Sequence, residues 1–144
     1  MIKRYKTALI TGAANGIGSS ILKKLSDYKF KIYALDRDKR KLKTICNETG
    51  AFPLNIDVTN IDLLYSKLSK LDVDILINNA GIGNGIEGLL KSSKGDILKS
   101  TRVNYESILH ILKILVPKMV KKRNGHIFLI GSIAGLYPTD SAIY

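Results

Sequence analysis

The chain of 144 residues has the size of one ordinary domain, residues 1–144, and its 45% hydrophobic content is enough for a substantial core. Its formal net charge of +11 raises the question of a nucleic-acid partner, but the lysines are spread along expected helix faces with no aromatic residues between them to stack on bases. We therefore expect solvated surface and no nucleic-acid partner. No apolar run reaches the roughly 18 residues of a membrane span, no signal-peptide pattern opens the chain, and a single cysteine cannot form an internal disulfide. These observations predict a cytoplasmic protein with no membrane partner.

Apolar runs alternate with segments of helical periodicity along the whole chain. The runs are rich in Ile, Leu and Val and lie at residues 6–11, 31–36, 51–57, 73–78 and 126–131. Segments with helical spacing lie between them, at residues 17–27, 38–48, 60–70 and about 95–122. This alternation predicts an α/β fold, a doubly wound, Rossmann-like parallel sheet with helices on both faces.

The first expected strand leads into a loop with three glycines, Gly12, Gly16 and Gly18. Glycine lets a backbone turn tightly and approach a ligand closely, where a side chain would hold the ligand away. A helical segment follows, so free N–H groups at the start of that helix would face a bound anion. We interpret the loop, with Asn15 and Ile17 in it, as a cradle for a diphosphate, although the spacing GxxxGxG differs from the general dinucleotide fingerprint.

Ligands of a doubly wound sheet bind beyond the carboxyl ends of its strands, and polar residues follow the second strand at that place. Asp36 comes 20 residues after Gly16, the interval at which a carboxylate can accept both ribose hydroxyls of an adenosine and repel a 2′-phosphate. Arg37 could instead pair with such a phosphate. We favour NAD over NADP because Asp36 sits at the strand end and Asn15 places no positive charge in the loop. A helix N-cap or a solvated turn is the structural alternative for Asp36.

Polar and small residues also follow the third and fourth expected strands. Asp57 could accept a hydrogen bond from an adenine amino group while Val58 covers the ring, but a turn or cap role for Asp57 is equally consistent with its position. Asn79, Ala80 and Gly81 combine an amide with two small residues, which lets the backbone pass close to a ligand. We include all five in the predicted cofactor site.

Residues 11–18 and 78–81, together with Asn104, Ser132 and Tyr144, resemble the short-chain dehydrogenase/reductase family over the whole chain. The resemblance implies an NAD(P)-dependent oxidoreductase that transfers hydride between the nicotinamide and a small-molecule secondary alcohol or ketone. It also implies that the long helix at about 95–122 packs across a homo-oligomer interface.

The resemblance further implies roles for three catalytic residues. Tyr144 would act as the general acid/base, Ser132 would hydrogen-bond the carbonyl oxygen, and Asn104 would hold a water in the proton relay. Taken singly, each of the three also has an ordinary structural interpretation. His110 and His126 have no partners at metal-ligand spacing, so we assign no metal.

The sequence departs from the family pattern in two ways. The family's lysine lies four residues beyond its tyrosine, and this sequence stops at Tyr144. The interval from Ser132 to Tyr144 is one residue short, so Ser141 stays as an alternative for the serine role. We expect a sheet truncated after about five strands, with an exposed apolar edge that favours self-association, and no dehydrogenase activity from these 144 residues alone. The alternative function is a non-catalytic nucleotide-binding or regulatory fragment.

Overall fold

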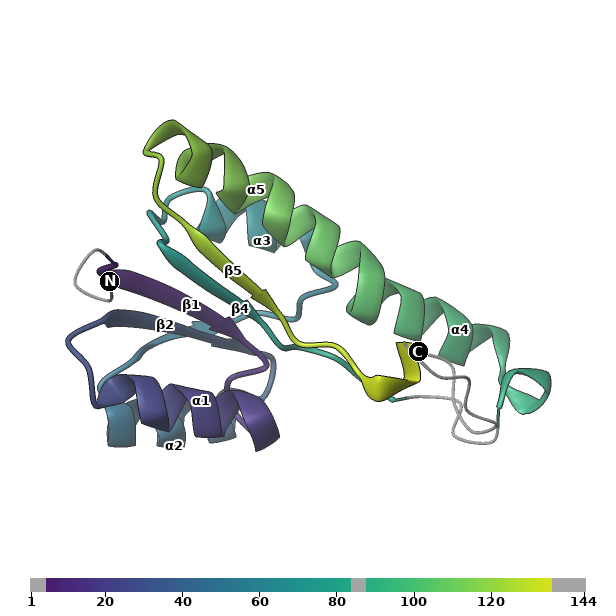
Figure 1. The fold of residues 1–144 in the computed structure, drawn as a ribbon. Coiled ribbons are helices and arrows are strands. Elements are labelled where there is room, and N and C mark those ends of the chain that lie inside the picture. Colours follow the sequence, from purple (N-terminus) through teal and green to yellow (C-terminus); the bar gives the residue numbers. More distant parts are fainter. Residues whose placement is uncertain (1–4, 84–87, 136–144) are drawn as a thin grey trace.

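The computed structural model describes residues 5–83 and 88–135 and contains a parallel sheet with strand order β3-β2-β1-β4-β5 (Figure 1). The doubly wound fold predicted from the alternating pattern is confirmed. The strands are β1 (Thr7–Thr11), β2 (Lys31–Asp36), β3 (Phe52–Asn55), β4 (Ile75–Asn78) and β5 (His126–Leu129), several of them shorter than the apolar runs that predicted them. Within the described ranges no helix is long and apolar enough to cross a membrane.

Helices cover both faces of the sheet and enclose two separate cores. Helices α1 (Gly16–Ser26) and α2 (Lys39–Thr49) pack on one face, whereas α3 (Ile61–Leu68) and α5 (Ser107–Lys121) lie side by side on the other (Figure 1). Alternate residues of β1 enter the two cores, since Ala8 and Ile10 face one and Leu9 faces the other. This double burial explains why the strand sequences are apolar without interruption.

The segment expected as one long helix consists of three elements. Helix α4 (Lys94–Thr101) begins with a capping box in which Ser93 and Asp96 each bond the other's backbone N–H. A π-helical turn (Arg102–Glu106) follows and runs directly into α5. Such a turn inserts one residue into the helical hydrogen-bond pattern, so the prediction of an uninterrupted helix was wrong. The turn carries Asn104.

One carboxylate ties together the amino-terminal ends of the inner strands. Asp74, just before β4, accepts hydrogen bonds from the N–H groups of Lys6 and Thr7 at 2.8 and 3.1 Å, and from Lys122 Nζ and Asn124 Nδ2 at 2.6 and 3.1 Å. Partial burial raises the pKa of Asp74, but the Lys122 ammonium and the backbone donors more than offset it and hold the pKa below its usual range. The ionised carboxylate therefore stabilises the end of the sheet opposite the glycine loop.

Strand β5 lies at the edge of the sheet. In the described part of the chain it pairs only with β4, and Phe128 and Leu129 are 45% and 56% exposed. The expectation of an exposed apolar edge is confirmed for this strand, while self-association through it stays a prediction.

Candidate functional site

The glycine loop packs its backbone directly against neighbouring backbone. Gly12 has a positive φ of +64°, and a Cβ on it would lie 2.9 Å from Ala80 Cα. A Cβ on Gly18 would lie 2.1 Å from the carbonyl oxygen of Gly12. Neither position has room for a side chain, so these glycines bring the start of α1 close to the ends of β1 and β4.

A buried hydroxyl joins the segments that follow β1 and β4. Thr11 Oγ1 accepts from the N–H groups of Asn79 and Ala80 at 3.0 and 2.9 Å and donates to Asn78 Oδ1 at 3.0 Å. The Asn79 side chain also binds the loop, because its Nδ2 donates to the carbonyl oxygens of Thr11 and Gly12 at 3.0 and 3.2 Å. Thr11 belongs to the loop motif in the sequence, but no role was predicted for it. Its signal is a hydroxyl residue at a strand position that is otherwise apolar.

The end of β2 reaches back to the glycine loop. Asp36 Oδ2 accepts from Ala14 N–H at 3.0 Å, and Oδ1 accepts from Asp38 N–H at 2.9 Å. The N-cap of α2 is Asp38, whose side chain accepts from Lys41 N–H at 3.0 Å. The cap alternative for Asp36 was therefore wrong by two residues, and the Asp36 carboxylate lies at the site edge instead.

Asp57, just after β3, supplies a second carboxylate, and its side chain forms the turn that was one of its two predicted roles. Asp57 accepts from Thr59 N–H and the Thr59 hydroxyl at 2.9 and 2.8 Å, and Arg37 Nη1 lies 3.6 Å from its Oδ2. Burial raises the pKa of Asp57, but the two Thr59 donors and the Arg37 charge outweigh it, so its pKa lies below the usual range. Asp57 is thus a carboxylate at neutral pH, and Arg37 is held toward it.

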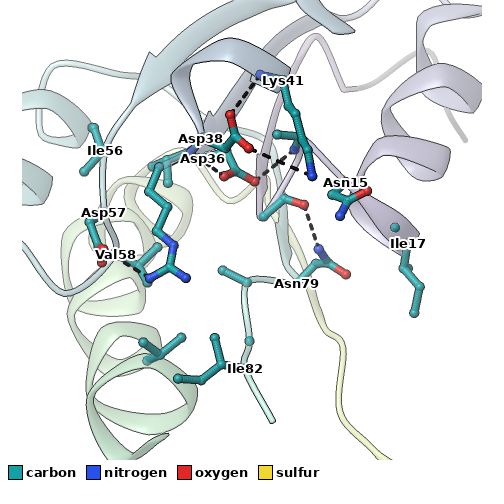
Figure 2. Close-up of a pocket in the computed structure, with 18 residues that line it drawn as sticks. Asn15, Ile17, Asp36, Asp38, Lys41, Ile56, Asp57, Val58, Asn79 and Ile82 are labelled. Atoms are coloured by element: carbon teal, nitrogen blue, oxygen red, sulfur yellow. Dashed lines mark hydrogen bonds and ion pairs between the residues drawn. The ribbon is translucent and has the colours of Figure 1, made fainter. Parts of the chain in front are cut away.

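These strand ends line one cavity of about 430 Å³ (Figure 2). Most residues of the predicted cofactor site meet in it: Gly12, Asn15, Gly16, Ile17, Asp36, Arg37, Asp57, Val58, Asn79, Ala80 and Gly81. Gly18 does not line the cavity, because its backbone packs behind the loop against Gly12. Seven further residues line the cavity that were not among the predicted cofactor residues: Ala14, Leu35, Asp38, Lys41, Ile56, Ile82 and Val103. All but Lys41 and Val103 directly adjoin a predicted cofactor residue in the sequence.

Of the predicted catalytic residues, the two that the structure describes, Asn104 and Ser132, lie outside this cavity lining. Both polar atoms of the Asn104 side chain are used by one residue, since Oδ1 accepts from Ile82 N–H at 2.9 Å and Nδ2 donates to the Ile82 carbonyl oxygen at 2.8 Å. Asn104 therefore fixes the segment after β4. Ser132 follows β5, where its exposed hydroxyl accepts from Ala134 N–H at 3.2 Å. Tyr144 and the alternative serine, Ser141, lie outside the described residues.

Potential metal ligands do not gather anywhere in the described ranges, where no three or more His, Cys, Asp or Glu side chains form a group. Tyr65 Oη lies 3.4 Å from His110 Nδ1, and the His126 ring stacks on Phe128 with centroids 4.5 Å apart. Both histidines have contacts of an ordinary structural kind.

Comparisons with known proteins agree with this geometry. Residues 6–144 match the family described as short chain dehydrogenase. The chain is 33% identical to an uncharacterized short-chain type dehydrogenase/reductase, y4eK, of Sinorhizobium fredii, over 99% of this chain and 58% of that protein. It is 31% identical to the NADP-dependent 3-hydroxy acid dehydrogenase YdfG of Escherichia coli, over 90% of this chain and 55% of that protein. The chain thus spans little more than half the length of these curated relatives.

Solved structures resemble this fold closely. A closed form of serine dehydrogenase complexed with NADP⁺ superposes with a TM-score of 0.87 and 31% sequence identity, over 92% of this chain and 56% of that chain. A metagenomic short-chain oxidoreductase in complex with NADP gives a TM-score of 0.89 and 28% identity, over 95% of this chain and 67% of that one. Both structures contain a nicotinamide dinucleotide.

Proposed function

Because the chain belongs to the short-chain dehydrogenase/reductase family, we propose that its cavity binds a nicotinamide adenine dinucleotide as the cofactor of an oxidoreductase. The observation that carries the proposal is the meeting of four strand ends and the start of α1 around one cavity. When bound, the cofactor would supply hydride transfer to or from a small-molecule alcohol or carbonyl compound. A non-catalytic nucleotide-binding role is the second candidate, favoured by the position of Ser132 away from the cavity lining.

The start of α1 is the part of the site suited to a diphosphate. The first intrahelical bond of α1 runs from Ser19 N–H to the Asn15 carbonyl oxygen at 3.2 Å. The N–H groups of Gly16, Ile17 and Gly18 therefore have no acceptor within the helix. The N–H groups of Gly16 and Ile17, which line the cavity, and the positive end of the helix dipole would bind a diphosphate, and Asn79 on the opposite side keeps the loop in place.

The adenosine would lie between the ends of β2 and β3. Asp36 keeps unused lone pairs for ribose hydroxyls, because each of its oxygens accepts one backbone N–H. Ile56 and Val58 supply apolar surface beside the Asp57 carboxylate, as Figure 2 shows. This arrangement supports the assignment of Asp57 as an acceptor for the adenine amino group, with Arg37 as its present partner.

For the choice between the two cofactors, we propose a preference for NAD. The Asp36 carboxylate at the end of β2 would repel a 2′-phosphate, and the Arg37 guanidinium is drawn toward Asp57. YdfG is NADP-dependent by name, and the two solved structures contain NADP, so the opposite preference is the competing outcome. Isothermal titration with each cofactor tests it: we expect NAD to bind at least about tenfold more tightly, a difference of about 1.4 kcal/mol. Tighter binding of NADP would contradict the preference.

The proposed catalytic roles concern three residues. Ser132 would donate a hydrogen bond to the substrate oxygen, and Tyr144 would exchange a proton with that oxygen. Asn104 would act by holding the Ile82 backbone and the water of the relay near it. Sequencing the gene beyond codon 144 separates the two candidate functions, because a lysine four residues after Tyr144 would complete the catalytic set that the family resemblance implies, whereas its absence would favour the non-catalytic one.

The proposed partners are a small-molecule substrate and a second copy of the chain. Tyr105 and Leu109, near the start of α5, are 63% and 48% exposed, which supports an interface along this helix. Sedimentation velocity over a range of protein concentrations tests whether a dimer forms.

A further inference from the structure

The Asp36 carboxylate joins the glycine loop to the start of α2. Its two oxygens accept from Ala14 N–H in the glycine loop and Asp38 N–H at the start of α2, at 3.0 and 2.9 Å. The neighbouring backbone makes a parallel contact, because Ala13 N–H donates to the Leu35 carbonyl oxygen at 3.2 Å. The end of β2 thus holds two consecutive amides of the loop.

These contacts determine which backbone N–H groups remain available to bind an anion. Ala14 N–H already has an acceptor, so it does not point freely into the diphosphate position. The N–H groups at the first turn of α1 are the ones without intrahelical acceptors. Where those groups point depends on the course of residues 12–15, which is set by Asp36 on one side and by Asn79 on the other.

We propose that Asp36 is a positioning residue for the diphosphate loop, a role separate from any hydrogen bond to ribose hydroxyls. The inference rests on the proposed function, since it concerns how the same cavity binds its ligand. Its consequence is specific: loss of the carboxylate weakens the binding of a diphosphate ligand even when that ligand carries no ribose hydroxyl.

Charge alone predicts the opposite result. Removing a negative charge near an anion strengthens the binding of that anion. If Asp36 only accepted hydrogen bonds from ribose hydroxyls, its removal would not weaken the binding of a ligand without those hydroxyls. A weakened affinity for a diphosphate lacking hydroxyls is therefore explained by the loop contact and by neither of the other two effects.

The test compares ADP with 2′,3′-dideoxy-ADP by isothermal titration on the full 144-residue chain. For Asp36→Ala we expect both ligands to bind about tenfold more weakly, as expected for the loss of a charge-assisted hydrogen bond. Asp36→Asn has one acceptor oxygen for two amides and should recover part of the loss. The comparison variant for charge is Asp38→Asn, which removes a negative charge from another residue of the cavity lining while keeping an oxygen for the α2 cap. Loss of charge alone should let it bind dideoxy-ADP as tightly as wild type or more tightly.

Hydrogen exchange of the Ala14 amide in the ligand-free chain is an independent second readout. We expect this amide to lose protection in Asp36→Ala and to keep it in Asp38→Asn, with dispersed NMR spectra showing that each variant is folded. Unchanged Ala14 protection, or weaker binding of ADP with unchanged binding of dideoxy-ADP, would overturn the positioning role. If wild type keeps Ala14 protected but binds neither ligand, the proposed function fails, and the inference fails with it.

Discussion

Replacing Gly18 by alanine tests the close backbone packing on which the site depends. The new Cβ would lie 2.1 Å from the Gly12 carbonyl oxygen and 2.6 Å from Asn79 Nδ2, where ordinary van der Waals contacts are 3.4–4 Å. Because the nearer obstacle is backbone, the loop or the helix has to move, and the cost falls at the upper end of overpacking, about 3 kcal/mol. Alanine favours a helix over glycine by up to about 1 kcal/mol, which leaves a net loss of about 2 kcal/mol.

Urea unfolding followed by circular dichroism measures this loss, and titration with NAD measures the effect on the loop. Gly95→Ala is the matched control, since Gly95 also lies in the first turn of a helix but has only an ordinary contact of 3.5 Å with Ser93 Oγ. We expect the control to be as stable as wild type or slightly more so, with cofactor binding unchanged. A Gly18→Ala variant that matches wild type in both measurements would refute the packing argument.

Three further predictions concern the contacts that hold the sheet and the site. Thr11→Val keeps the side-chain shape but leaves two backbone N–H groups after β4 without their acceptor, and it should lower the free energy of unfolding by about 2–3 kcal/mol in urea; a loss below about 0.5 kcal/mol would contradict this role. Asp74→Ala should lower the free energy of unfolding by about 2 kcal/mol at pH 7, because two backbone donors lose their acceptor while Lys122 keeps Asp72 at 2.6 Å. Since the pKa of Asp74 is lowered in the folded chain, its contribution is fully present above about pH 4 and is lost as the pH falls through the folded pKa; the gap between wild type and variant should therefore close at low pH, and a constant gap would contradict the assignment. Asn104→Ala should speed hydrogen exchange of the Ile82 amide and weaken cofactor binding, whereas unchanged exchange would show that the side chain does not fix this segment.

The sequence was sufficient to predict the fold because its information is local and repeated. Residues of the paired strands β1 and β4 alternate between two cores: Leu9 and Leu76 enter one, and Ala8 and Ile75 enter the other. Burial on both faces requires apolar residues at every position, and this uninterrupted apolar run is visible in the sequence. The cavity could be predicted for a related reason. Parallel strands place their carboxyl ends at one edge, so polar residues such as Asp36 and Asp57, which follow separate strands, line the same cavity.

Contacts between distant segments could not be predicted in the same way. The hydroxyl of Thr11 binds residues 67 to 69 positions later in the chain, and a hydroxyl residue in an apolar strand does not by itself show which distant residues it binds. The contact of Asp36 with Ala14 depends on where the glycine loop lies relative to the end of β2, which the local sequence does not determine. The π-helical turn around Asn104 keeps the helical periodicity nearly intact, so the pattern predicted one continuous helix.

The cavity beyond β1, β2, β3 and β4 is proposed to bind a nicotinamide adenine dinucleotide. The most direct measurement is an NMR titration of the chain with NAD and with NADP, with the amide shifts mapped onto the structure. We expect saturable shifts for at least one cofactor, centred on Gly16, Ile17, Asp36 and Val58, with little change at the opposite end of the sheet around Asp74. Absence of saturable shifts up to millimolar cofactor, or shifts centred away from this cavity, would contradict it.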